Sequence, residues 1–178
     1  MAPTAAGRPQ ELAETLALAK AEAVATEEGE GIVIAADTIV VDGDTILGKP
    51  ADSSEAAAML RRLRGKTHRV ITGLALVDPG SGQQAASHVV TSVRMRPYSD
   101  AEIAAYVTRG DPLDKAGAYA IQDEAFHPVA SYQGCYCNVV GLPLKALVTL
   151  LRRASLDITP ESLETLPPEC ARCPIVVE

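Results

Sequence analysis

The sequence predicts an α/β domain with a mixed central β-sheet flanked by helices. Segments with helical spacing of apolar residues are interleaved with short runs rich in β-branched residues, and turn signals separate them. Hairpin turns join several of the expected strands, so a standard doubly wound sheet, with a crossover helix after each strand, is disfavoured. The chain of 178 residues is long enough for one such domain, and 47% apolar residues exclude a disordered chain.

The expected helices carry start and stop signals. Asp52 with Glu55, and Ser99 with Glu102, have the spacing of capping boxes, and Pro143 suits the first position of a last helix. Glycines follow the first three helices, as is common at helix ends. The expected helices cover residues 10–28 (with Leu12, Leu16, Ala19 and Ala23 at helical spacing), 56–64, the segment between Ser99 and Gly110, and 143–153.

The expected strands are short and bounded by glycine, proline or aspartate. Asp42-Gly43 is a typical hairpin turn, and Asp78-Pro-Gly-Ser-Gly is a typical loop between strands. The tail from Leu156 contains four prolines, so we expect it to be irregular. The expected strands cover residues 31–36, 38–41, 45–47, 67–77, 89–96, 118–121 and 128–132.

Composition disfavours several classes of function. Acidic residues outnumber basic ones by 23 to 16, the net charge is −7 and no basic stripe is present, so a DNA-coating protein is disfavoured. Five Tyr, one Phe and no Trp are too few for a platform that stacks single-stranded nucleic acid. No apolar run approaches the roughly 20 residues that span a bilayer. With four cysteines and no apolar signal segment, we expect reduced thiols in a cytoplasmic protein.

Two candidate site residues follow expected strands. Asp37 comes after the strand 31–36, where a carboxylate lies at the rim of a sheet and can meet a ligand, or can simply cap a turn. Lys49 lies in Gly48-Lys49-Pro50, where it can neutralise a phosphate or can be a solvated loop residue.

Two further segments combine small and polar residues. Small residues beside Lys115 let a ligand approach the backbone closely. Gln122 offers a donor and an acceptor to the edge of a base. The alternative is that this segment is only a tight turn into a strand. The loop 138–143 enters a helix whose N-terminus either faces an anion or is only capped. None of these segments matches a P-loop, a GxGxxG fingerprint or a HExxH pair.

The cysteines and histidines carry little signal. Cys170 and Cys173 have CxxC spacing, but the sequence indicates no second ligand pair, so a zinc or redox role is disfavoured. Cys135 and Cys137 alternate near an expected strand end, which predicts that they point to opposite faces. His68 and His127 have no evident partners and are expected to be structural or solvated.

Five segments together resemble the Maf family of nucleoside triphosphate pyrophosphatases, which have an inosine-triphosphatase-like fold. The resemblance runs from about Pro9 to Arg153 in the family's order, and five collinear motifs are more specific than any one alone. It favours the functional interpretations of Asp37, Lys49 and Gln122. The segments are Ala36-Asp37-Thr38-Ile39-Val40-Val41, Leu47-Gly48-Lys49-Pro50, His68-Arg-Val-Ile-Thr72-Gly73, Asp114-Lys115-Ala-Gly117-Ala-Tyr119-Ala-Ile-Gln122 and Asn138-Val-Val-Gly141-Leu-Pro143.

The resemblance implies hydrolysis of a nucleoside triphosphate to the monophosphate and pyrophosphate, by attack of water on the α-phosphorus with Mg²⁺ or Mn²⁺. It makes Asp37 the proton acceptor, a metal ligand or both, and it makes Lys20 and Lys49 phosphate contacts. Lys115 belongs to a matched motif, where it contacts substrate or braces its loop. A homodimer is also implied.

The resemblance further implies a substrate class. Thr38 and Gln122 match positions tied to substrate choice, and the form of the segment 114–122 resembles the branch that acts on dTTP and UTP. Gln122 suits a pyrimidine because an amide can pair with an adjacent carbonyl and N–H.

The start of the chain departs from the family pattern. Family members begin with a strand, a Ser-x-x-Arg-Arg-type loop and an acidic residue, and none of these precedes the Lys20 helix here. We therefore expect an N-terminally truncated Maf fold, with a pyrophosphatase domain over 9–154 and a Pro-rich tail over 155–178. Either the true start lies upstream of Met1, or the chain is a relative with weak or no catalysis.

Three other functions stay open at this point. The chain can be a nucleotide-binding regulator of cell division, an α/β domain whose tail docks a partner, or a purine-directed pyrophosphatase of the wider superfamily.

Overall fold

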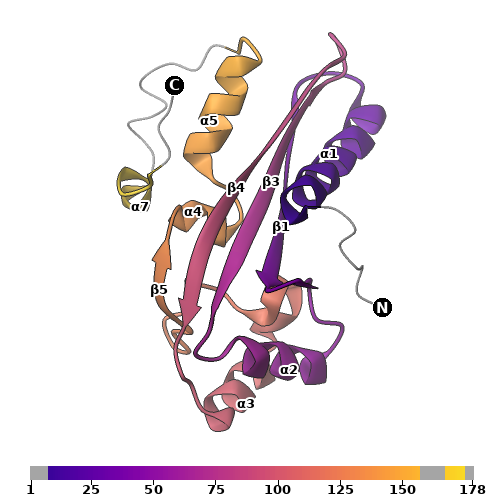
Figure 1. The fold of residues 1–178 in the computed structure, drawn as a ribbon. Helices are drawn as coiled ribbons and strands as arrows, with labels where there is room; N and C mark the ends of the chain where they lie inside the picture. Colours follow the sequence, from indigo (N-terminus) through magenta and orange to yellow (C-terminus); the bar gives the residue numbers. More distant parts are fainter. Residues whose placement is uncertain (1–7, 157–166, 175–178) are drawn as a thin grey trace. The chain divides into compact units, whose positions relative to one another are not determined.

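The computed structural model describes residues 8–156 and 167–174. Helices and strands are interleaved along the chain, which confirms the α/β class (Figure 1). The strands are β1 (Val33–Asp42), β2 (Thr45–Leu47), β3 (Thr67–Asp78), β4 (Gln83–Met95) and β5 (Val129–Gln133). The helices are α1 (Pro9–Glu28), α2 (Ser53–Leu63), α3 (Asp100–Thr108), α4 (Tyr136–Val140), α5 (Leu144–Arg153) and α7 (Pro168–Ala171), with 3-10 turns η1 (Asp111–Asp114) and η2 (Ala116–Ala118). Among these described helices, none combines the length and apolar character needed to cross a bilayer.

Five strands of the described chain form a sheet in the order β2-β1-β3-β4-β5. The pairings of β1 with β2 and of β4 with β5 are antiparallel. A tight turn that starts at Asp78 joins β3 to its neighbour β4, so this pair is antiparallel as well. The β1–β2 and β3–β4 pairs are hairpins, as the expected turns at Asp42-Gly43 and at Asp78 indicate.

The chain divides into two compact units, which we describe separately. The α2–α3 unit comprises residues 39–70 and 91–133, and the described part of the α1–α5 unit comprises residues 8–38, 71–90, 134–156 and 167–174. The division into a domain over 9–154 and a tail over 155–178 stays a prediction.

The α1–α5 unit contains the helix expected over 10–28. Gly29 ends α1 in a left-handed conformation, and its N–H donates to the Ala25 carbonyl. The buried face of α1 is not the one predicted from the spacing of Leu12, Leu16, Ala19 and Ala23. Leu16, for example, is 37% exposed. Alanines spaced four residues apart are buried instead, and they pack against β3 and β1; they are Ala13, Ala17, Ala21 and Ala25.

Small side chains on this stripe allow α1 to approach β3 very closely. A Cβ atom added at Gly73 of β3 would lie 2.1 Å from the Ala13 carbonyl oxygen and 2.7 Å from the Glu14 nitrogen. Both neighbours are backbone atoms, which cannot rotate away as a side chain can. Gly73 is therefore required by the contact between the two elements.

The α2–α3 unit is held by capped helices and an aromatic core. Ser99 and Glu102 form the expected capping box, and the hydrogen bonds from the Ser99 backbone N–H and from Arg96 lower the pKa of Glu102 to about 2. The Phe126 ring stacks on Tyr106 with centroids 4.4 Å apart and also contacts Tyr98. The Tyr98 hydroxyl donates to the Leu60 carbonyl of α2 at 2.8 Å, so the core also ties α2 to the segment before α3.

Three predicted strands differ from the structure. Segments 31–36 and 38–41 form one strand, β1, and Asp37 lies inside it rather than at a strand end. Because β1 lies beside β3 in the sheet, its backbone stays paired past a polar side chain. Residues 118–121 are not a strand, because Gly117 and Ala118 have φ angles of 70° and 61°, which turn the chain into η2.

Three predictions near the C-terminus are also corrected. The expected loop at Asn138 is the short helix α4, and the tail expected to be irregular contains α7. Cys135 caps α4 and Cys137 lies in its first turn, so strand alternation does not apply to this pair and the prediction of opposite faces is wrong. Both sulfur atoms instead lie in one buried cluster.

We expect Gly73→Ala to destabilise the protein strongly, because the new methyl group would overlap the α1 backbone. Overpacking typically costs about 1–3 kcal/mol of unfolding free energy, and a clash with backbone atoms belongs at the upper end of this range. Gly48→Ala is the matched control, since nothing lies within 4 Å of a Cβ atom there. Urea unfolding of both variants measures the effect, and equal stability of the two would contradict the described contact.

Candidate active site

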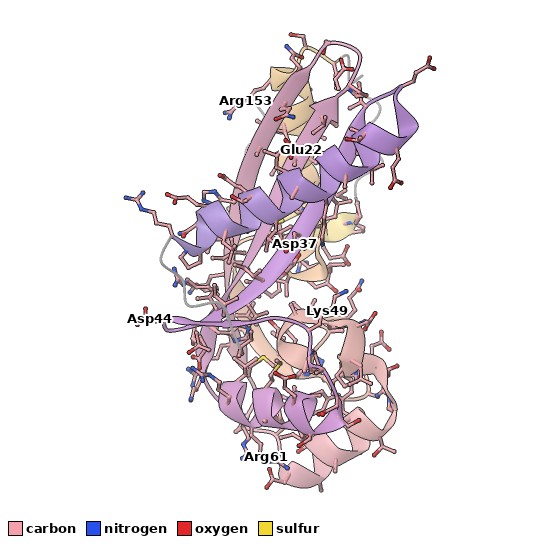
Figure 2. The ribbon with its side chains drawn as sticks, turned by 90° about the vertical axis from the view of Figure 1, so that its right-hand side faces the viewer. Glu22, Asp37, Asp44, Lys49, Arg61 and Arg153 are labelled. Carbon is pink, nitrogen blue, oxygen red and sulfur yellow. The ribbon has the colours of Figure 1, made fainter. Side chains whose placement is uncertain are left out.

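The structure brings Lys20 and Asp37 together in the α1–α5 unit. Lys20 projects from α1, and its Nζ atom donates to Oδ1 of Asp37 on β1, which is labelled in Figure 2. The Lys20 side chain is 59% exposed and the Asp37 side chain is 16% exposed. An ion pair with one such exposed partner contributes only about 0–1 kcal/mol to stability. The pair can therefore separate at little cost when another anion approaches Lys20.

Thr38 lies on the opposite face of β1 from Asp37. Neighbouring residues of a strand point to opposite faces, and Val33 and Ala35, which share the face of Asp37, pack against α1. Ala36, on the face of Thr38, packs with Leu150 of α5. The structure thus places the predicted proton acceptor, Asp37, and the predicted substrate-choice residue, Thr38, on opposite faces of one strand.

A chain of hydroxyl groups holds Thr38 in place. The buried Thr72 hydroxyl of β3 donates to the Asn138 carbonyl of α4 at 3.0 Å. Because that bond uses the one hydroxyl proton of Thr72, the Thr38 hydroxyl is the donor across the 2.8 Å contact between the two threonines. Thr38 Oγ1 keeps lone pairs that can accept from a ligand. Gly141 borders it, since a Cβ atom there would lie 3.6 Å away.

Three predicted site residues belong to the α2–α3 unit. The backbone N–H of Gly117 donates to the Gly48 carbonyl at 3.0 Å, so the loop that carries Lys115 is fastened beside Lys49. A Cβ atom at Gly117 would meet the Val40 side chain at 3.0 Å, which shows how closely this loop packs on β1. The two motifs, distant in sequence, are therefore neighbours, as shared participation in one binding site requires.

Lys49 and Lys115 both lower the pKa of Asp114. Lys115 Nζ donates to Asp114 Oδ1 at 2.7 Å, and this bond is the largest cause of a lowered pKa at Asp114, to which the Lys49 charge adds. The three side chains keep one net positive charge. Such a loop can bind an anionic group if Asp114, which is exposed, turns to solvent.

Gln122 lies in an exposed turn. The chain just before this turn is held by a buried contact between Tyr119 and His68. The Tyr119 hydroxyl and His68 Nε2 are 2.7 Å apart, and their rings meet edge to face. Burial lowers the pKa of His68 to about 4, although the Asp42 charge opposes this effect, so His68 is neutral at pH 7. The expectation that His68 is structural is confirmed, and the Gln122 amide stays open to solvent.

Sequence analysis singled out neither Thr72 nor Asn138 as a functional residue. A signal for Thr72 was present, because it is the one hydroxyl residue in the run from Val70 to Val77. Asn138 begins a matched motif, but its contribution is a backbone carbonyl, which side-chain identity does not predict.

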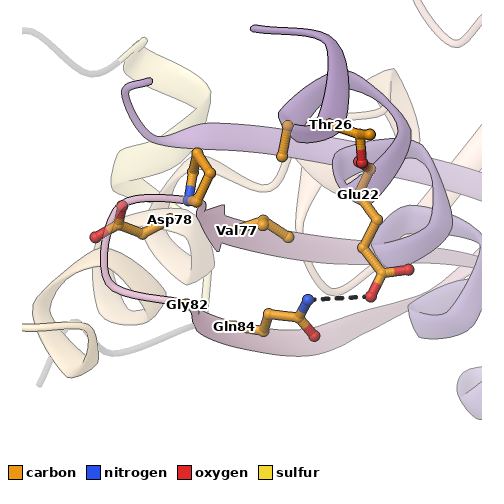
Figure 3. A pocket seen from close by; sticks show the side chains of 8 residues that line it. Glu22, Thr26, Val77, Asp78, Gly82 and Gln84 are labelled. Carbon is orange, nitrogen blue, oxygen red and sulfur yellow. Dashed lines mark hydrogen bonds between the residues drawn. The ribbon is translucent and has the colours of Figure 1, made fainter. Parts of the chain in front are cut away.

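A surface pocket of about 480 Å³ also lies in the α1–α5 unit, where α1 meets the β3–β4 turn (Figure 3). Glu22 and Asp78 line it, and Glu22 accepts a hydrogen bond from Gln84 at 3.1 Å. No predicted site residue lines it, and its carboxylates would repel a phosphate chain. It is not a candidate for the substrate site.

Comparison with known proteins identifies the class to which this fold and these residues belong. The model of the family described as Maf-like protein matches residues 2–154. The chain belongs to the Maf family.

Relatives in three bacteria carry the name dTTP/UTP pyrophosphatase. The protein of Thermomicrobium roseum is 47% identical over 167 residues, which cover 94% of this chain and 76% of the relative. The protein of Salinibacter ruber is 49% identical over 159 residues, which cover 89% of this chain and 77% of the relative. The protein of Symbiobacterium thermophilum is 50% identical over 153 residues, which cover 86% of this chain and 78% of the relative.

Thr72→Val should weaken the support of Thr38. The change removes the hydroxyl at nearly constant volume and should lower the unfolding free energy by about 1–2 kcal/mol. Thr15→Val, at an exposed position of α1, is the control and should change it by less than about 0.5 kcal/mol. Denaturant unfolding compares the two, and a loss no larger for Thr72→Val than for Thr15→Val would refute the buried hydroxyl chain.

His68 should make stability depend on pH. Its folded-state pKa of about 4 lies below the usual 6.5, so the unfolded chain binds more protons between these values. Stability should therefore fall as the pH drops from 6.5 to 4, by up to about 3 kcal/mol. His68→Gln should flatten this slope, whereas His127→Gln at an exposed position should not. Thermal unfolding across this pH range is the measurement, and parallel curves for wild type and His68→Gln would contradict the assignment.

Proposed function

We propose that the protein hydrolyses dTTP and UTP to the nucleoside monophosphate and pyrophosphate. Membership of the Maf family and relatives named dTTP/UTP pyrophosphatase support this proposal. The observation that carries it is the contact between Lys20 and Asp37, a cation and a carboxylate that the motif match assigns to phosphate binding and proton transfer.

Asp37 is the proton acceptor in this proposal. Water attacks the α-phosphorus, the bond from that phosphorus to the bridging oxygen of the β-phosphate breaks, and pyrophosphate leaves. Asp37 takes the proton that the attacking water loses. A positioned carboxylate base contributes about 10²- to 10⁴-fold to a rate.

Lys20 has two partners in the reaction cycle. Without substrate it pairs with Asp37, as the structure shows. When a triphosphate binds, its negative charge competes for the Lys20 ammonium, and the carboxylate is released to accept a proton. The exposure of Lys20 makes this exchange of partners inexpensive.

A divalent cation, Mg²⁺ or Mn²⁺, is part of the proposal. Asp37 brings one carboxylate, and its ion-pair partner Lys20 brings none. This suits Mg²⁺, which is commonly held by one or two carboxylates with substrate phosphates and water. Asp37 would hold the ion, which supplies positive charge against the phosphate oxygens when bound.

The remaining predicted residues concern substrate binding. We propose that Lys49 and Lys115 bind phosphate and that the Gln122 amide pairs with a pyrimidine edge, while Thr38 contributes to substrate choice. The fastening of the Gly48 and Gly117 loops to each other supports a shared role for Lys49 and Lys115. A homodimer and a cytoplasmic location are proposed on the resemblance and composition alone, and no nucleic acid or membrane partner is proposed.

Asp37→Asn tests the function directly. We expect pyrophosphate release from dTTP and UTP with Mg²⁺ to fall by at least about 100-fold, because the amide cannot accept the proton. Asp44→Asn, on the exposed β1–β2 turn, is the matched control and should keep its activity. Calorimetric titration with a non-hydrolysable dUTP analogue separates binding from turnover.

Three outcomes would overturn parts of the proposal. Full activity in Asp37→Asn would remove this residue from the mechanism. Binding of the analogue without turnover by the wild type would favour the regulatory alternative. Faster hydrolysis of ITP than of UTP would favour a purine substrate.

A further inference from the structure

All four cysteines of the chain gather in one buried cluster of the α1–α5 unit. Cys135 and Cys137 come from α4 and its cap, and Cys170 and Cys173 come from α7 and the residues after it. Each is between 1% and 7% exposed, and none forms a disulfide. We call these four residues the cysteine cluster.

The sulfur atoms face one another rather than forming two remote pairs. The Cys137 and Cys170 sulfurs are 2.8 Å apart, and the thiols of Cys135 and Cys173 are hydrogen-bonded. All four cysteines belong to one cluster of buried residues. Val89 and Leu144 are the apolar neighbours that pack against the cluster.

We propose that Cys135, Cys137, Cys170 and Cys173 form a structural zinc site that fastens the C-terminal segment to α4. Four sulfur ligands from two short segments, one CxC and one CxxC, match the donor set of closed structural zinc sites. Thiolate ligands without carboxylate or water favour Zn²⁺ over Mg²⁺ or Mn²⁺. This site is separate from Asp37 and does not depend on the proposed pyrophosphatase activity.

Zinc binding requires a small adjustment of the cluster. Two sulfur ligands of a tetrahedral zinc ion lie about 3.7 Å apart, because each Zn–S bond is about 2.3 Å. The described side chains are tighter than this and do not surround a point at metal distances. Zinc binding would therefore move the Cys137 and Cys170 sulfur atoms about 1 Å further apart, and a change of the side-chain χ1 angles is the simplest movement of this size.

A metal explains the cluster better than disulfides do. Each of the four cysteines is at most 7% exposed, so a small-molecule disulfide has little access to their sulfur atoms. Disulfides would also need an external oxidant to reach nearly inaccessible sulfurs. Zinc needs none, since its binding displaces four thiol protons and forms four Zn–S bonds. The ammonium of Lys145, which donates to the Cys173 carbonyl at 3.0 Å, offsets part of the resulting double negative charge.

The site would act on two elements that are too short to be stable alone. The helix α7 has four residues and α4 has five, well below the length at which isolated helices form in water. The α4 segment also carries the Asn138 carbonyl that accepts from Thr72, and Gly141 borders Thr38. A zinc ion at the cysteine cluster therefore supports the backbone beside Thr38.

Metal analysis of the purified full-length chain, without a histidine tag, tests the proposal. We expect about one zinc per chain by mass spectrometry of the metal. Cys170→Ser/Cys173→Ser should lose it. Asp37→Asn is the control and should retain it, because Asp37 belongs to a different site. An Asp37→Asn chain that also loses zinc would overturn the proposal.

A second measurement on the wild type keeps the test valid if the double variant fails to fold. The chain is unfolded with acid and chelator, freed of metal and refolded with or without zinc under reducing conditions. Zinc should raise the melting temperature. In denaturant, the four thiols should react with a disulfide reagent, and the native protein should release its zinc as they do. No zinc and four reactive thiols would overturn the proposal, and a protein mass lower by about 4 Da would overturn it in favour of two disulfides.

Discussion

The close approach of α1 to β3 is the constraint on which the candidate active site depends. The Ala13 carbonyl occupies the space that a side chain at position 73 would need, so the two backbones are almost in contact. Alanines at four-residue intervals keep this distance along the helix. Only with α1 held this close to the sheet can Lys20, an exposed residue of the helix, reach the partly buried carboxylate of Asp37.

Strand β1 divides reactive and supporting roles between its two faces. Asp37 meets α1, whereas Thr38 meets β3 and α4 through buried hydroxyl and carbonyl groups. The contacts of Thr38 on one face thus hold the β1 backbone, and the Asp37 carboxylate projects from the other face of the same strand. The cysteine cluster adds to the same support, since it includes the cap of α4, whose Asn138 ends the hydroxyl chain.

Features set by local chemistry were predictable from sequence, and those set by distant contacts were not. The capping box at Ser99 and the glycine after α1 involve residues within one turn, and both are as expected. The place of Asp37 within a strand depends on sheet neighbours, and the buried face of α1 depends on Gly73, 60 positions after Ala13. The cysteine cluster joins α4 to α7 across a gap of 33 residues. Pairing of Lys20 with Asp37 was indicated only by family resemblance.

The anchoring of α1 at Ala13 has a consequence for how this segment can vary. Lys20 lies seven positions after Ala13, and seven steps of about 100° bring the helix to within about 20° of two full turns. Loss or gain of one residue in this interval would swing Lys20 through about 100° around the helix axis and move it about 1.5 Å along that axis. The interval should accept many substitutions at its exposed positions yet no insertion or deletion. The geometry therefore constrains the length of this interval more tightly than its composition.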